Sequence, residues 1–226
     1  MPEVVNPNGG GGNITNYSVS GAKKRIYHSS KEPLAGYTKL ELESGKVTYQ
    51  RFVDGLVGNI TYLAMQDGEF GKKLKIFLSE IGETSALQVS VDKAEYRAFI
   101  DAIYNVDFSK LVQISFYEGK SANDPSKKYQ NCYVCYPDEL VEVDGKQKPK
   151  RAEFLDKKDC PQGVQRKKGW DFSDQEDWYY ERMEELIERF NKYKNSQPIN
   201  KPVAHTGQKV QERVTDDVDV SNDLPF

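Results

Sequence analysis

The sequence has no long run of apolar residues, and this absence sets its first limits. No stretch of the 226 residues approaches the roughly 18 apolar residues that a membrane-spanning helix needs, and no apolar signal-peptide segment stands at the start. Cysteine is scarce as well, with three residues in the chain, so a disulfide framework is not expected. We therefore expect a cytoplasmic protein with no membrane partner.

Residues that commonly carry catalysis or bind metals are also few. The chain has two histidines, and it contains neither a Gly-rich phosphate loop nor a nucleophile elbow. Cys132 and Cys135 have Cys-x-x-Cys spacing, but they lie within an expected strand, where positions i and i+3 face opposite sides. We expect no enzyme, no cofactor and no metal site. A metal-dependent nuclease is the weakest alternative, because the acidic residues near 171–181 suit the start of a helix.

Charge is present in quantity and is unevenly distributed. The net charge is -3, yet residues 212–226 hold five acidic residues against one arginine. Residues 145–169 hold nine basic residues against three acidic ones. This asymmetry favours a polyanion as one partner and an acidic interaction tail.

Alternating polar and apolar residues predict a β-rich body. In the segment after Gly71, for example, Leu74, Ile76 and Leu78 point one way, and Lys73, Lys75 and Phe77 point the other. Tyr49 shares the parity of Val47 and Val53, which places it in the core. Pro137 ends the last strand of the body. The expected strands span residues 37–42, 47–53, 59–66, 72–80, 87–91, 110–118 and 128–136.

Two helices are expected. Tyr96, Phe99, Ile100 and Ile103 have helical spacing between Val91 and Asn105, with Ser90 or Asp92 as the N-cap.

The second helix spans 170–195, and Ser173 with Glu176 forms a capping box at its start. Its apolar seam must be buried either on the rest of the chain or, through 173–193, against a second copy. The seam consists of Tyr179, Met183, Leu186, Phe190 and Tyr193.

The order of elements predicts a mainly β fold. We expect a five-stranded OB-fold, a Greek-key barrel with one helix between its third and fourth strands, elaborated by an extra strand pair and a C-terminal amphipathic helix. A small β-sandwich is the alternative. The expected segments are a flexible Gly-rich arm (1–22), the OB-fold domain (23–136), a basic loop or linker (137–169), the amphipathic helix (170–195) and a disordered acidic tail (196–226).

The most specific signal is the end of the chain, where an acidic run closes on Asp223-Leu224-Pro225-Phe226. This end resembles the C-terminal tip of bacterial and phage single-stranded DNA-binding proteins. The chain is longer than typical bacterial members and lacks their Gly/Gln-rich linker, which points to a phage or mobile-element version acting in the host cytoplasm. The resemblance implies that the tip recruits replication, recombination or repair proteins, and that the tail folds back over the DNA-binding groove. The partner-binding residues are then Asp216, Asp217, Asp219, Asp223, Leu224, Pro225 and Phe226.

Basic and aromatic residues also alternate along the strands, and this combination holds single strands by phosphate contact and base stacking. Each aromatic residue taken singly fits ordinary strand packing as well. The expected DNA-binding residues are Lys39, Arg51, Phe52, Tyr62, Phe70, Lys72, Lys73, Lys75, Phe77, Tyr117, Lys127, Lys128, Tyr129 and Tyr133.

These features together predict a sequence-independent single-stranded DNA-binding protein that coats and protects exposed strands. Two alternatives stay open. One is an interaction adaptor that carries the tail but binds no DNA, and the other is an RNA-binding barrel, because stacking alone does not separate ribose from deoxyribose.

Overall fold

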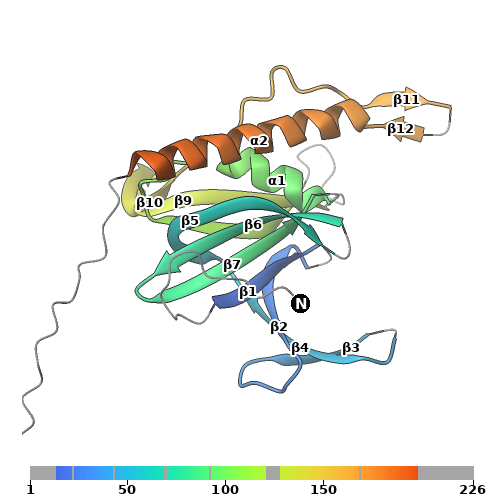
Figure 1. Ribbon diagram of the computed structural model, residues 1–226, viewed down its shortest axis with the longest axis vertical. Coiled ribbons are helices and arrows are strands. Elements are labelled where there is room, and N and C mark those ends of the chain that lie inside the picture. The colour runs from blue at the N-terminus through green and yellow to red at the C-terminus, as the bar shows by residue number, and fades with distance from the viewer. Residues whose placement is uncertain are drawn as a thin grey trace, which may run out of the picture.

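One mixed sheet dominates the fold (Figure 1). The computed structural model describes residues 14–21, 23–42, 44–68, 71–91, 93–120, 128–167 and 169–197. Within them, ten strands form the large sheet and two short strands form a separate ribbon. The sheet strands are β1 (Ile14–Ser20), β2 (Arg25–Ser30), β3 (Thr38–Glu41), β4 (Val47–Val53), β5 (Leu56–Gly68), β6 (Gly71–Glu80), β7 (Glu83–Ser90), β8 (Val112–Lys120), β9 (Lys128–Val143) and β10 (Lys146–Arg151). The ribbon strands are β11 (Val164–Arg166) and β12 (Gly169–Asp171), and the helices are α1 (Ala94–Ile103) and α2 (Ser173–Ser196).

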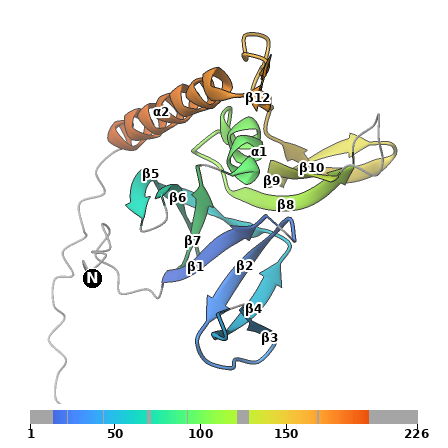
Figure 2. The same cartoon turned by 90° about the vertical axis from the view of Figure 1, so that its right-hand side faces the viewer.

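The strand order is β10-β9-β8-β5-β6-β7-β1-β2-β4-β3. Neighbours are antiparallel except β1 and β7, which run parallel. The sheet curls, as Figure 2 shows, so that β2 lies against β8 although these strands are not hydrogen-bonded neighbours. The mainly β prediction is confirmed, but the sheet is not closed.

The core fills the inside of this curl. Ile26 of β2, Leu74 and Ile76 of β6, Leu87 of β7 and Ile114 of β8 are fully buried there. α1 adds Phe99, whose ring stacks on Phe116 with centroids 6.0 Å apart. The helix predicted between Val91 and Asn105 is therefore present, although its N-cap is Lys93 and no side chain caps it.

β5 changes partner along its length, and a glycine allows the change. Its first residues pair with β8 and the rest pairs with β6. Gly58 lies at the switch with φ of +156°, and a Cβ there would come within 2.9 Å of the Leu78 carbonyl carbon and the Ser79 nitrogen. No other residue fits this position without moving the backbone.

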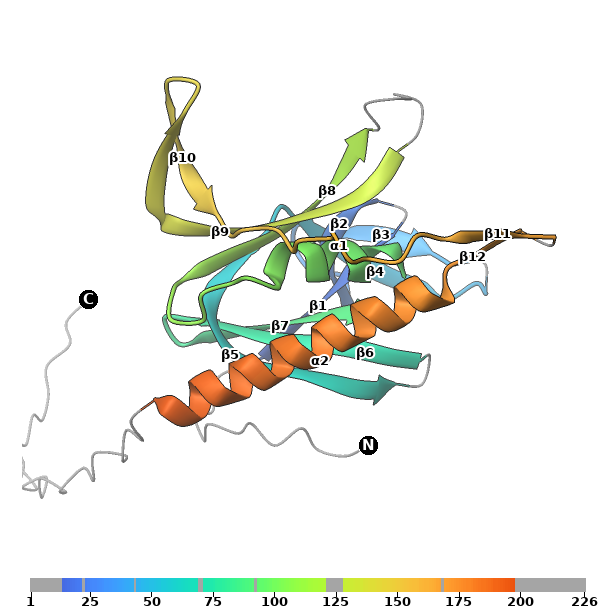
Figure 3. The same ribbon diagram turned by 90° about the horizontal axis from the view of Figure 1, so that it is seen from above.

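α2 packs on its own chain. Seen from above in Figure 3, it runs diagonally across the molecule, and it contacts α1 and β5. Tyr179, Met183, Leu186 and Phe190 of the predicted seam are buried. Self-association through this seam would require the helix to leave its place.

The predicted capping box of α2 is wrong. Phe172 is the N-cap and makes no side-chain cap hydrogen bond. Ser173 is the first helical residue, and both its backbone N–H and its hydroxyl donate to Asp171 Oδ1, at 3.0 and 2.8 Å. These two hydrogen bonds hold the pKa of the Asp171 carboxyl below its usual range.

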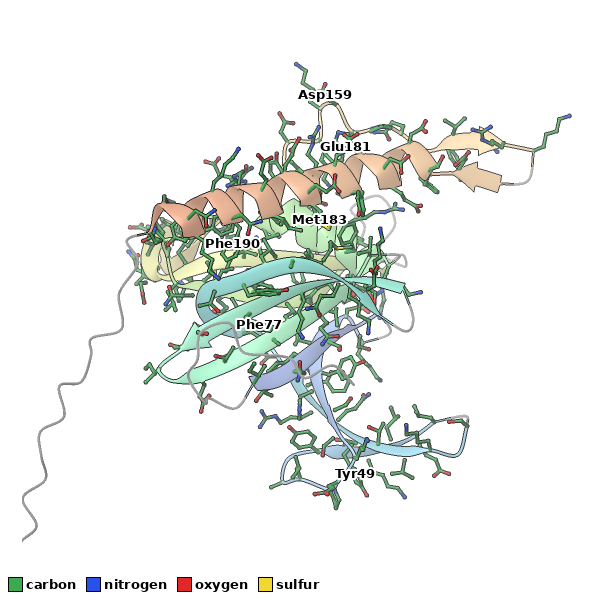
Figure 4. All side chains as sticks on the ribbon, in the orientation of Figure 1. Tyr49, Phe77, Asp159, Glu181, Met183 and Phe190 are labelled. Carbon is green, nitrogen blue, oxygen red and sulfur yellow. The ribbon has the colours of Figure 1, made fainter. Side chains whose placement is uncertain are left out.

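The docking of α2 makes a stability prediction. Met183 is fully buried, whereas Glu181 on the same helix is exposed; Figure 4 labels both. Met183→Ala is expected to lower the free energy of unfolding by about 2–5 kcal/mol, because it leaves a cavity beneath the helix. Glu181→Ala is the matched control and should change stability by less than about 0.5 kcal/mol. Urea denaturation measures both, and equal effects would contradict this packing of α2.

The flexible-arm prediction for residues 1–22 fails over residues 14–20. These residues form β1, an interior strand held between β7 and β2. Tyr17 and Val19 alternate with the polar residues Asn16, Ser18 and Ser20, and Tyr17 is buried. This alternation is typical of a half-buried strand. It was overlooked because it directly follows the Gly-rich segment in the sequence.

The linker prediction for residues 137–169 is also wrong for most of its length. β9 runs through Pro137 to Val143, and β10 pairs back along it. Residues 152–163 then lie along α1, where the Leu155 N–H donates to the Asp101 carbonyl at 2.8 Å and Lys157 forms an ion pair with Asp101. Ala152, Leu155 and Cys160 are buried. The basic segment is thus part of the folded body.

Three further features that the sequence analysis addressed are Tyr49, the cysteines of β9 and the length of the helices. Tyr49, labelled in Figure 4, lies half-buried in the projecting β3–β4 arm and not in the core. Cys132 and Cys135 are free, buried and within β9, as the strand interpretation requires. Across the described ranges, neither helix is long and apolar enough to cross a membrane.

Candidate nucleic-acid interface

The side of the sheet turned away from the core carries a continuous set of polar and aromatic side chains, here called the outer face. The strand registers place Phe52, Tyr27, Ser18, Gln88, Lys75 and Ala64 in one cross-strand row over β4, β2, β1, β7, β6 and β5. An adjacent row holds Asn16, Ala86, Phe77 and Tyr62. The outer face therefore extends across six strands without a break in hydrogen bonding.

Aromatic pairs stand at the two ends of this face. Tyr62 packs against Phe77 with ring centroids 4.8 Å apart, and Tyr27 packs against Phe52 at 6.0 Å. Three strand spacings, about 14 Å along the sheet, separate β6 from β2. Small or polar side chains of β7 and β1 fill the interval. The middle of the outer face therefore carries short side chains, with an aromatic pair on either side.

Phe77 is oriented as its parity predicts, but it is not exposed. Its exposed fraction is 4%, and yet it is no member of the contiguous core. Tyr62 covers one part of the ring, and the Lys75 ammonium lies 5.1 Å from its centroid. Phe77 therefore supports Tyr62, and the half-buried Tyr62 ring is the more accessible of the two.

Lys75 is also buried, with an exposed fraction of 6%, where exposure was expected. Burial disfavours the charged form and lowers the pKa of its ammonium group. In the part of the chain that the structure describes, no carboxylate pairs with it. A cation held this way gains more from an incoming phosphate than a lysine that is already paired with a carboxylate.

The outer face has no acidic residue within its strands. Arg25, Lys73 and Lys75 point outward, whereas no Asp or Glu occupies an outward position of β1, β2, β4, β5, β6 or β7. Asp54, which follows β4, forms an ion pair with Arg25 at the edge. The guanidinium of Arg25 also lies 5.9 Å from the Phe52 centroid. The charged residues that point outward from these strands are therefore all basic.

A second group, the tyrosines of β8 and β9, lies on the same side of the sheet. The Tyr117 and Tyr133 rings are 5.7 Å apart, and the Arg151 guanidinium lies 5.2 Å from the Tyr133 centroid. Tyr129 lies across Gly119, where a Cβ would come within 2.6 Å of its ring. This group extends the aromatic and basic character beyond β5, because β8 pairs with the start of β5.

Four of the expected DNA-binding residues do not join the outer face. Lys39 and Arg51 lie on the opposite side of the β3–β4 arm from Phe52, where Arg51 packs over the Tyr37 ring. Lys72 donates to the Tyr180 hydroxyl of α2 at 3.3 Å. Lys128 is paired with Glu118 at 2.9 Å. These residues were expected because they are basic and lie on nearby strands or turns, but their strand parity or their partners set them apart from the outer face.

Other expected residues lie outside the described residues. These are Phe70 and Lys127, and the complete partner-binding set Asp216, Asp217, Asp219, Asp223, Leu224, Pro225 and Phe226.

Sequence reasoning missed Arg25, Tyr27 and Arg151. The first two lie on β2, which was not assigned as a strand, although Ile26 between them is the apolar residue of an alternating run. Arg151 lies on β10, inside the expected linker.

The comparisons with known proteins add no relative. No protein-family model, curated protein or solved structure matches the chain. In the described ranges, no group of three or more His, Cys, Asp or Glu side chains is arranged to hold a metal ion. The outer face itself carries aromatic rings, short polar side chains and cations.

Proposed function

We propose that the chain is a single-stranded DNA-binding protein that uses the outer face to hold the strand without sequence preference. The observation that carries this proposal is the pairing of two aromatic clusters, Tyr62–Phe77 and Tyr27–Phe52, with outward cations and no outward acid. Bases stack on such rings whatever their identity, and lysine and arginine contact the phosphates. The small side chains between the two aromatic clusters leave room for the sugar-phosphate backbone of the DNA strand.

An OB-like arrangement supports this proposal. β5, β6 and β7 form a meander, α1 follows it, and β8 returns to pair with β5. This is the order of the first four strands and the helix of an OB-fold. The chain departs from the pattern after β8, because β1 occupies the place beside β7 while β9 continues outward to β10. In OB-folds, the second and third β-strands face the bound nucleic acid. The corresponding β-strands of this chain are β6 and β7.

The C-terminal sequence completes the proposal. Asp223-Leu224-Pro225-Phe226 and the acids before it offer an apolar wedge and diffuse negative charge to a basic, apolar pocket on another protein. We propose that replication, recombination or repair proteins read this tip while the outer face holds DNA.

Fluorescence anisotropy of a labelled oligo-dT strand of about 30 nucleotides tests the proposal. We expect saturable binding that weakens steeply between low and moderate salt, because phosphate contacts release counterions. An unlabelled duplex of equal length should compete poorly, and an oligo-rU strand measures any RNA preference. Absence of binding at low salt would sink the proposal and favour the adaptor alternative.

Removing the acidic tail makes a further prediction. A chain ending at Gln211 is expected to bind oligo-dT as tightly as the full chain or more tightly, because the deleted residues compete with DNA for the cations of the outer face. The gain should shrink as salt rises. The same anisotropy titration measures it, and a loss of affinity on deletion would contradict competition by the tail.

A further inference from the structure

The β11–β12 ribbon leads into the start of α2 and projects beyond it, as Figures 1 and 3 show. Its two strands are antiparallel, with Gln165 opposite Trp170. It makes no hydrogen-bonded pair with the large sheet and is separate from the outer face.

The ribbon displays two large aromatic side chains. Trp170 is 62% exposed and Phe172 is 40% exposed, and their rings are stacked at 21° with centroids 6.2 Å apart. Two-thirds exposure of a tryptophan forgoes a large amount of apolar burial. The pair is therefore not explained by packing within the described chain.

The inner member of the pair is fixed in place. Phe172 lies against Gly163, where a Cβ would come within 2.3 Å of the ring, and the Arg97 guanidinium lies 5.8 Å from its centroid. Arg97 is itself held by Gln175 at 2.8 Å and Glu176 at 2.9 Å. Phe172 is thus a fixed support, and Trp170 extends the stack toward solvent.

The charges near the exposed Trp170 indicate the chemical class of a partner that would cover it. Arg166 and Lys167 lie in and next to β11, and the one carboxylate of the ribbon, Asp171, accepts hydrogen bonds from Ser173 and pairs with Arg166. Among the described residues no carboxylate pairs with Lys167, and a rigid stacked ring beside such a cation matches the requirements of a base and its phosphate. An apolar protein surface would match the rings but would leave Lys167 without a counter-charge.

We propose that Trp170 is a second stacking platform for single-stranded DNA. The proposal rests on the proposed function, because the strand it receives is the one bound on the outer face. The ribbon would then contact a more distant part of the same strand, and longer strands would gain from both sites.

Intrinsic fluorescence tests this assignment, because the chain has two tryptophans and the other, Trp178, is 8% exposed. Oligo-dT of about 30 nucleotides should quench the wild-type emission, and the quench should persist in Trp178→Phe and vanish in Trp170→Phe. If Trp178→Phe does not fold, the comparison of the quench in wild type and in Trp170→Phe tests the assignment. Anisotropy run in parallel keeps the two proposals apart. Binding without any change in Trp170 emission overturns this inference alone, and absence of binding overturns both.

Affinity gives the second measurement. Trp170→Ala should weaken oligo-dT binding about tenfold, the effect of losing one stacked base. Phe154→Ala removes an aromatic ring of similar exposure, 47%, from a segment beside α1 and serves as the matched control. Equal affinities of Trp170→Ala and Phe154→Ala would overturn the assignment.

Discussion

Replacing both Tyr27 and Tyr62 by alanine is expected to weaken oligo-dT binding by about thirtyfold or more. Tyr62 is the accessible ring of its pair on the outer face, and Tyr27 is one of the two half-buried rings of the other pair. Each base stacked on an aromatic ring contributes roughly 1–3 kcal/mol, and the two sites lie far enough apart for their losses to add. Anisotropy with labelled oligo-dT measures the change at fixed salt.

The matched control for this pair is Tyr49→Ala. Tyr49 is a half-buried strand tyrosine of β4 on the opposite side from Phe52. It should leave the affinity within about twofold of wild type. Circular dichroism and urea denaturation establish that each variant folds. A folded double variant with wild-type affinity would remove the outer face from consideration.

Lys75→Met is expected to have opposite effects on binding and on stability. The variant keeps the apolar stem of the side chain and removes a buried ammonium group that has no carboxylate partner in the described chain. Stability should rise by roughly 1 kcal/mol because desolvation of that charge is no longer required. The slope of log affinity against log salt should fall by about 0.7, the value of one phosphate contact on a single strand.

The stability effect should depend on pH in a defined direction. Burial lowers the pKa of Lys75 in the folded state, so the unfolded chain holds the proton more tightly. Stability of the wild type therefore rises with pH between the folded and unfolded pKa values, the latter near 10.4. The advantage of Lys75→Met is greatest below the folded pKa and disappears as pH passes the unfolded one. Urea denaturation of both proteins from about pH 7 to about pH 11 measures it.

Lys39→Met provides the control for Lys75→Met. Lys39 is an exposed strand lysine on the side of the arm away from Phe52. Neither its stability nor its salt slope should differ from wild type. If Lys75→Met lowered stability, or left the salt slope unchanged, Lys75 would be a structural residue and not a phosphate contact.

Local pattern was sufficient to predict the elements with strong periodicity. The alternation around Leu74, Ile76 and Leu78 gave β6 and its two faces correctly, and the spacing from Tyr96 to Ile103 gave α1. The seam of α2 followed from the same reasoning, because an apolar stripe at intervals of three and four residues has to be covered. Local pattern could not show which other element packs against each face of a strand or helix.

The errors have a common physical cause, which is dependence on distant segments. β1 gains its strand structure from parallel pairing with β7, more than sixty residues away, so its own short, polar sequence gave a weak signal. β9 continues through Pro137 because β10 pairs with it from the other side, with a register shift between Pro149 and Lys150. The burial of Phe77 depends in the same way on a neighbour from another strand, Tyr62 of β5.

The candidate site was therefore only partly predictable. Parity placed Lys73, Lys75 and Phe77 on the correct side of β6, whereas Phe52 and Tyr62 were expected only because they lie on nearby strands. It could not show that Tyr27 joins Phe52, because that contact needs β2 to be recognised first. Nor could it separate a free lysine from one engaged by Glu118 or Tyr180.

Photocrosslinking tests the central claim, that the outer face holds the strand, most directly. The full chain is bound to an oligo-dT strand carrying 5-iodouracil at several positions and irradiated, and the crosslinked peptides are identified by mass spectrometry. Crosslinks to the peptides that contain Tyr27, Phe52 and Tyr62 are the predicted result. A stable complex whose crosslinks avoid all three, and fall on the exposed side of α2 or on Tyr49, would contradict it.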